Sequence, residues 1–190
     1  KSGANYYLEY FHIGPLIKKR IEYYENLPQC LEPKYESLYY KALSINKVNT
    51  HSPEGKIPHL WSTPDRVPHR HMWLWDSVFH ALAYKEYNLE AAKECLLAML
   101  KQQRVNGFIP HMANPTDTSD ITQPCILAWG VYRVYLKCGD REFLRTCAPY
   151  LERYLRWNIE NRDENNNGLL EWYTEPGDFH CKCGESGLDN

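Results

Sequence analysis

Several loop-like parts of this sequence combine tryptophan with carboxylate, imidazole or amide groups: Trp73, Trp75, Asp76, His111, Gln123, Glu171 and Trp172. An indole face can stack on the apolar C–H face of a sugar ring, while the polar groups can bind its hydroxyl rim. These residue types therefore predict a carbohydrate pocket. The sequence lacks the glycine-rich phosphate loops and the His-Glu-x-x-His pattern that are typical of nucleotide and metalloprotease sites.

A second polar segment resembles the first half of a calcium loop. Asp163, Asn165 and Asn167 alternate along it, and Gly168 follows where such loops turn sharply. The twelfth position is Thr174, where a calcium loop has glutamate. Two interpretations stay open: a structural calcium ion that uses other ligands as well, or a simple Asn-Gly turn. No cofactor is otherwise required by these residues.

Composition and charge exclude several classes of function. The chain has 190 residues, 43% of them hydrophobic and 24% charged, which is typical of a single globular domain spanning 1–190. Lys and Arg total 22 against 24 Asp and Glu, so no basic field is available to bind a nucleic acid. The longest apolar stretch without a charge, 121–132, is shorter than the roughly 20 residues of a membrane-spanning helix.

The cysteines and the first residues bear on the cellular compartment. Seven cysteines are scattered mostly along helix-like segments, which favours buried thiols over a disulfide framework. The chain starts at Lys1 with no export signal after it, and we expect it to be trimmed from a longer protein. The compartment is therefore unknown, although the cysteines favour a reducing one such as the cytoplasm.

The spacing of apolar residues predicts an all-α fold. Helices are expected from Pro15 to Pro28, over 33–45, over 75–87, after an Asn88 cap, over 124–138 and after an Asp140 cap. Segments 57–61 and 169–173 are the only candidates for short paired strands. Long polar loops alternate with tight turns, a layout typical of an (α/α) toroid or a helical solenoid. The helix starts near Asp76, Gln123 and Asp189 would then share one end.

Six short runs occur in order over roughly the last two thirds of the chain: 61–66 (WSTPDR), 73–80 (WLWDSVFH), 107–111 (GFIPH), 122–124 (TQP), 167–172 (NGLLEW) and 185–190 (ESGLDN). As a set they resemble glycoside hydrolase family 63, which includes processing α-glucosidases and bacterial relatives and is allied to the trehalases. The resemblance implies an (α/α)6 barrel, about half of it present here, that hydrolyses α-glucosides or α-mannosides with inversion.

The resemblance also implies roles for particular residues. Asp189 corresponds to the general acid, and Asp76 to a carboxylate that holds sugar hydroxyls, with Trp75, His111 and Gln123 beside it. The family's general base is a glutamate much further along the barrel. We therefore expect the base to lie outside this chain, and the chain alone to be inactive. The expected partner is an oligosaccharide or a small glycoside.

Structural interpretations of the same residues stay open. Asp76 can complement a helix dipole, His111 can be a turn residue satisfied by the backbone, and Gln123 can act only as a cap. Two other functions also stay open. One is a non-catalytic carbohydrate-binding helical domain, and the other is a helical scaffold for protein partners.

Overall fold

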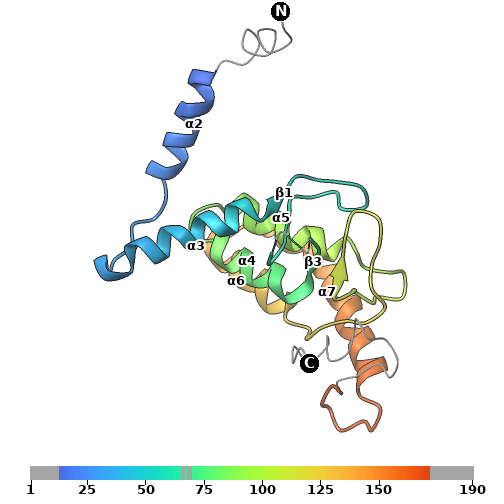
Figure 1. The fold of residues 1–190 in the computed structure, drawn as a ribbon. Coiled ribbons are helices and arrows are strands. Elements are labelled where there is room, and N and C mark those ends of the chain that lie inside the picture. Colours follow the sequence, from blue (N-terminus) through green and yellow to red (C-terminus); the bar gives the residue numbers. More distant parts are fainter. Residues whose placement is uncertain (1–12, 66, 68–69, 172–190) are drawn as a thin grey trace, which may run out of the picture. The chain divides into compact units, whose positions relative to one another are not determined.

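The structure is a computed structural model that describes residues 13–65, 67 and 70–171 (Figure 1). By compactness the chain divides into two units, 1–36 and 37–190. The interpretation of 1–190 as one partial catalytic domain remains a prediction, because compactness does not define a functional unit. The described residues are mostly helical, and none of their helices is both long and apolar enough to cross a membrane.

The first unit contains the helix α2 (Ile13–Glu25) and a short 3-10 turn, η1 (Pro33–Tyr35). Pro15 lies in the first turn of α2, where its fixed φ suits a helix and its missing N–H costs nothing. The helix ends before Pro28, as predicted. No residue of α2 is buried.

The second unit contains all but the first residue of α3 (Glu36–Val48), together with α4 (Leu74–Tyr84), α5 (Leu89–Leu100), α6 (Leu127–Cys138) and α7 (Arg141–Arg162). Helix α3 extends past its predicted end because the buried Asn46 donates from Nδ2 to Tyr87 Oη, 3.1 Å away, instead of starting a loop. Pro124 precedes α6 rather than lying in its first turn, since the Ile126 N–H bonds back to the Pro124 carbonyl.

The predicted helix caps are confirmed. Asn88 accepts a hydrogen bond from the Ala91 N–H at 3.0 Å at the start of α5. Asp140 accepts from two N–H groups in the first turn of α7. Gly139 ends α6 with φ +66°, a left-handed conformation that favours glycine. Two tight turns, 85–88 and 139–140, therefore join α4 to α5 and α6 to α7.

Two short antiparallel ribbons accompany the helices. β1 (Thr50–His51) pairs with β2 (Trp61–Ser62), and β3 (Met72–Trp73) pairs with β4 (Met112–Ala113). The predicted pairing of 57–61 with 169–173 is wrong for the described residues, because Trp61 pairs with His51 and 169–171 form no strand. Closing a local loop of about ten residues costs less entropy than pairing segments about a hundred residues apart.

The core lies among α4, α5, α6 and α7, which contact one another (Figure 1). Helices α4 and α6 approach closely at Gly130, where an added Cβ would lie 2.7 Å from Val78 Cγ1. The long connection 101–126 leaves one end of this helical layer, and the tight turns close the other. The predicted alternation of long loops and tight turns is confirmed over 74–162.

Candidate carbohydrate site

Three segments meet at the first turn of α4. Trp73 ends β3 with extended backbone, and α4 begins directly after it. The Leu74 N–H donates to the His111 carbonyl at 2.8 Å, and the Trp75 N–H donates to Gln123 Oε1 at 3.1 Å. These are two of the N–H groups that a helix start leaves without an intrahelical partner. The structure thus brings together Trp73, Trp75, His111 and Gln123, from three parts of the sequence.

His111 is a buried imidazole beside the Trp73 ring. The two ring centroids lie 5.1 Å apart at 70°, an edge-to-face contact, and His111 Nδ1 lies 2.6 Å from Ser119 Oγ. Its backbone N–H donates to the Ile121 carbonyl. Burial lowers the pKa of His111 to about 4, against a smaller opposing effect of the Ile121 backbone. The ring is therefore neutral near pH 7, and can act as a hydrogen-bond donor or acceptor.

Trp73 contributes a buried polar atom. Its Nε1 has no hydrogen-bond partner among the described residues. Buried N–H groups are nearly always paired, so this donor can bind an oxygen that none of the described residues supplies. A sugar hydroxyl has that chemistry.

Gln123 is held through both its side chain and its backbone. Its Oε1 accepts from the Trp75 N–H, and its Nε2 group is the hydrogen-bond donor of the same side chain. The Gln123 carbonyl accepts from Tyr154 Oη at 3.0 Å, and that phenol oxygen lies 2.6 Å from Thr122 Oγ1. Gln123 does not cap the helix that follows it, since Ile126 is the N-cap of α6; its side chain instead accepts from the first turn of α4, 48 residues earlier.

A cavity of about 210 Å³ opens beside Gln123, between the segment before α6 and the end of α7. It is lined by Thr122, Gln123, Pro124, Cys125, Ile126, Asn158, Arg162, Leu170 and Glu171. Of the predicted site residues, Gln123 and Glu171 line this cavity. Its lining does not include Trp73, Trp75, Asp76 or His111. Gln123 is thus the residue that joins the cavity to the cluster at α4.

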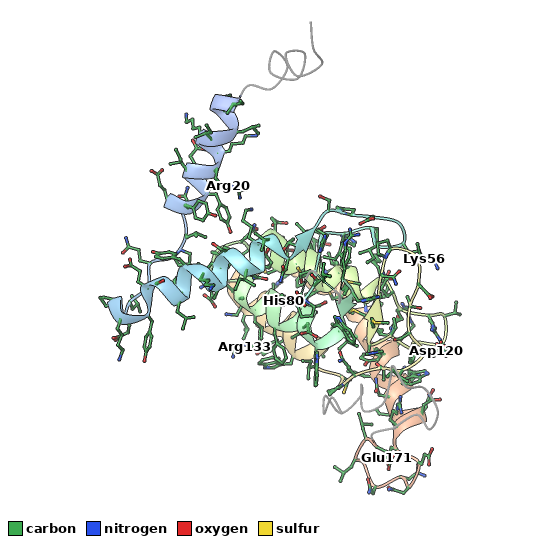
Figure 2. The ribbon with its side chains drawn as sticks, viewed as in Figure 1. Arg20, Lys56, His80, Asp120, Arg133 and Glu171 are labelled. Carbon is green, nitrogen blue, oxygen red and sulfur yellow. The ribbon has the colours of Figure 1, made fainter. Side chains whose placement is uncertain are left out.

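Glu171 lies in the polar loop after α7 (Figure 2). Its carboxylate accepts from the Glu164 N–H and from Asn165 Nδ2, both at 2.9 Å. Asp163 accepts from the Asn167 and Gly168 N–H groups, and Gly168 has φ +82°. These bonds fit the Asn-Gly turn. Calcium binding by Asp163, Asn165 and Asn167 remains a prediction, and no cluster of three or more His, Cys, Asp or Glu suited to a metal occurs within the described ranges.

The remaining predicted residues divide into two groups. Asp76 lies half-buried in the first turn of α4, where its charge also complements the helix dipole, and Trp75 packs partly against the core. Asp189 and Trp172 lie outside the residues that the structure describes.

Sequence reasoning missed the contribution of α7 to this region. Tyr154 and Asn158 follow the helical period of the apolar face, and the sequence therefore predicts packing roles for them. Both are buried polar residues, and Arg162 continues the same spacing into the cavity. Polar residues at successive i, i+4 positions of a buried stripe were the signal that could have indicated a site.

Comparison with known proteins identifies relatives of this chain. A family model described as the mannosylglycerate hydrolase MGH1-like glycoside hydrolase domain matches residues 69–190. The mannosylglycerate hydrolase of Thermus thermophilus is 31% identical over 156 residues, covering 68% of this chain and 35% of that protein. The glucosylglycerate hydrolase of Mycolicibacterium hassiacum is 29% identical, covering 63% and 33%.

Solved structures agree with this assignment. The crystal structure of a GH63 mannosylglycerate hydrolase from Thermus thermophilus, in complex with Tris and D-glycerate, matches with a TM-score of 0.60 and 28% identity. The match covers 69% of this chain and 35% of the other. The chain thus spans about a third of the length of the relatives it matches. Since the family model covers more than half of the chain, the chain belongs to the mannosylglycerate hydrolase MGH1-like glycoside hydrolase family, which confirms the resemblance to glycoside hydrolase family 63.

Proposed function

We propose that this chain supplies sugar-binding residues and the general acid to a glycoside hydrolase that cleaves α-glucosides or α-mannosides with inversion. The observation that carries the proposal is the meeting of Trp73, His111 and Gln123 at the start of α4, within the region that matches the family. This cluster offers the Trp73 indole N–H and the Gln123 amide group as donors, and Asp76 lies in the same first turn of α4. Such a mixed set suits a hydroxyl rim.

The fold proposed for the whole protein is an (α/α)6 barrel. The hairpins α4–α5 and α6–α7 support it, because each has a tight turn at one end and a long connection at the other. Contacts of α4 with α6 and of α5 with α7 fit two concentric layers of helices. On this proposal the candidate site lies at the end where the long connections meet.

Catalysis would proceed in one displacement. Asp189 protonates the glycosidic oxygen, and water attacks the opposite face of the sugar under a base outside this chain. Inverting enzymes hold their two carboxyl groups roughly 6.5–9.5 Å apart to accommodate that water. Asp76 and Trp75 fix the ring, and Glu171 and Trp172 complete the pocket. The chemistry needs no cofactor, and a calcium ion at Asp163, Asn165 and Asn167 would be structural.

The relatives suggest the substrate class. Two of them are named for mannosylglycerate and glucosylglycerate. We therefore propose a small α-glycoside whose aglycone carries a carboxylate, with mannose or glucose as the sugar.

Substitution of the proposed acid tests the mechanism. In a full-length protein that contains this chain and the base, Asp189→Asn should abolish nearly all turnover and leave substrate binding largely intact, because the amide cannot donate the required proton. The matched control is Asp120→Asn, since Asp120 is highly exposed and pairs only with Arg104 among the described residues (Figure 2). Turnover should be unchanged in the control. Retained activity in Asp189→Asn would reject the assignment.

A non-catalytic carbohydrate-binding domain is the second candidate, favoured by one observation. The site residues within the described ranges are suited to holding a sugar, while none of them has a family role in proton transfer. This function predicts calorimetric binding of mannosylglycerate or glucosylglycerate without hydrolysis by the full-length protein. A protein scaffold predicts neither binding nor hydrolysis, and tolerates Asp76→Ala.

A further inference from the structure

We propose that Tyr154, on α7, is a positioning residue for the candidate carbohydrate site: its hydroxyl fixes the Thr122–Gln123 segment so that the Gln123 side chain meets the start of α4. The inference rests on the proposed function for its meaning, but its geometry can be tested without any sugar. Tyr154 belongs to none of the motif runs that carry the family resemblance.

The hydrogen bonds around Tyr154 have a defined direction. The phenol has one proton, which it donates to the Gln123 carbonyl at 3.0 Å. The 2.6 Å contact with Thr122 Oγ1 must then have the threonine hydroxyl as donor. Burial raises the pKa of Tyr154, so the phenol remains protonated and keeps its donor role across the physiological range.

All three residues are enclosed. Tyr154 is 1% exposed, Thr122 3% and Gln123 4%. Loss of the Tyr154 hydroxyl would therefore remove the donor that the buried Gln123 carbonyl accepts from. The segment 122–125 precedes the bond from the Gly130 N–H to the Ile126 carbonyl that starts α6, so side-chain bonds such as that from Tyr154 hold its backbone in place.

The same bonds connect α7 to α4. From Tyr154 the connection passes through the Gln123 backbone to Gln123 Oε1, and from there to the Trp75 N–H at 3.1 Å. A shift of the Gln123 backbone would break the bond to Trp75 and turn the Nε2 donor away from the start of α4. Tyr154 thus holds the backbone of Gln123, the residue that lines the cavity and also bonds to the start of α4.

Hydrogen exchange of the Trp75 amide tests this connection in the 190-residue chain. In Tyr154→Phe the Trp75 amide should exchange about tenfold faster, because its acceptor is no longer held. The amide of Leu96, in the core of α5, should keep its protection. An unchanged Trp75 amide would overturn the proposal, and so would equal acceleration of both amides, since that reports general destabilisation.

Matched variants show whether faster exchange comes from losing the Tyr154 hydrogen bonds or from removing a tyrosine hydroxyl in general. Tyr150→Phe, one turn earlier on α7, removes a hydroxyl that accepts from Lys101 at the surface, and should leave Trp75 exchange unchanged. If Tyr154→Phe does not fold, Thr122→Val and Thr122→Ser replace it. Valine removes the hydroxyl and should accelerate Trp75 exchange, whereas serine retains it and should restore the wild-type rate. Equal rates in the two threonine variants would contradict the proposal.

Kinetics of the full-length hydrolase test the functional consequence. Tyr154→Phe should raise KM about tenfold with little change in kcat, because it weakens sugar binding and leaves the acid untouched. In a Gln123→Ala background the same substitution should change KM less than about twofold, since both act through one side chain. Additive effects would reject action through Gln123. An inactive wild type would reject the proposed function, while the exchange result would still stand.

Discussion

Two histidines, the buried His111 and the half-buried His80, make the stability of this fold dependent on pH. Burial lowers the pKa of each to about 4, below the ordinary value near 6.5. Between these values the unfolded chain binds more protons than the folded chain, so stability is complete above about pH 6.5 and falls as the pH decreases toward 4. The expected loss is at most about 1.4 kcal/mol per pH unit for each histidine.

Urea denaturation at about pH 7.5, 6.0 and 5.0 measures this dependence. We expect His111→Asn to be less stable than wild type at the highest pH but to lose less stability as the pH falls to the lowest. The carboxyl of Glu86, whose pKa is lowered to about 2 by Lys137 and Lys85, loses its contribution only at more acidic pH, below its own ordinary value. Equal pH slopes in variant and wild type would show that His111 does not titrate in this way.

Residue types predicted part of the site. Two interpretations of His111 followed from its type, a turn residue or a sugar ligand, and its bonds to Ile121 and Ser119 with the Trp73 contact are compatible with both. Gln123 behaves similarly, since it caps α4 and also lines the cavity. Side-chain type and local spacing cannot reveal such double roles, because the partners at α4, Trp73 for His111 and Trp75 for Gln123, lie tens of residues away.

At the scale of the elements, the contact between α4 and α6 depends on a glycine. Gly130→Ala would place a methyl group 2.7 Å from Val78 Cγ1, and valine can hardly yield because its side chain is stiff. The gain in helix propensity, about 1 kcal/mol, is opposed by an overpacking cost of about 1–3 kcal/mol. We expect a lower urea midpoint. Gly14→Ala in α2 is the control, because no atom lies within 4 Å of the added Cβ, and it should not lower the midpoint.

Elements were predicted well where the determinants are local. The 3.6-residue period, the Asn88 and Asp140 caps and Gly139 located α5 and the turn between α6 and α7. The start of α6 was misplaced because Pro124 is compatible with a first helical turn, whereas in the structure the Ile126 N–H bonds back to the Pro124 carbonyl and the helix starts later. The short ribbons were missed because pairs of two residues carry no alternation.

At the scale of the whole molecule, α6 presents an apolar stripe that nothing within the described residues covers. Trp129, Tyr132 and Leu136 lie at i, i+3 and i+7 and are 46%, 54% and 58% exposed, whereas Val131 and Val134 face the core. The solved structure described above is about three times as long as its matched region, since the match covers 35% of it. In the proposed barrel, a further helix of the longer protein would pack on this stripe.

Leu136→Glu tests that arrangement by comparing two lengths of protein. In the 190-residue chain the substitution should change the free energy of unfolding by less than about 0.5 kcal/mol, because the side chain is exposed. In a longer family protein that contains this chain, it should cost about 2 kcal/mol or more, because a charge would be buried against a neighbouring helix. Chemical denaturation of both proteins measures the difference. If the cost is equally small in both, no further helix covers this face of α6, and the barrel proposal would have to be abandoned.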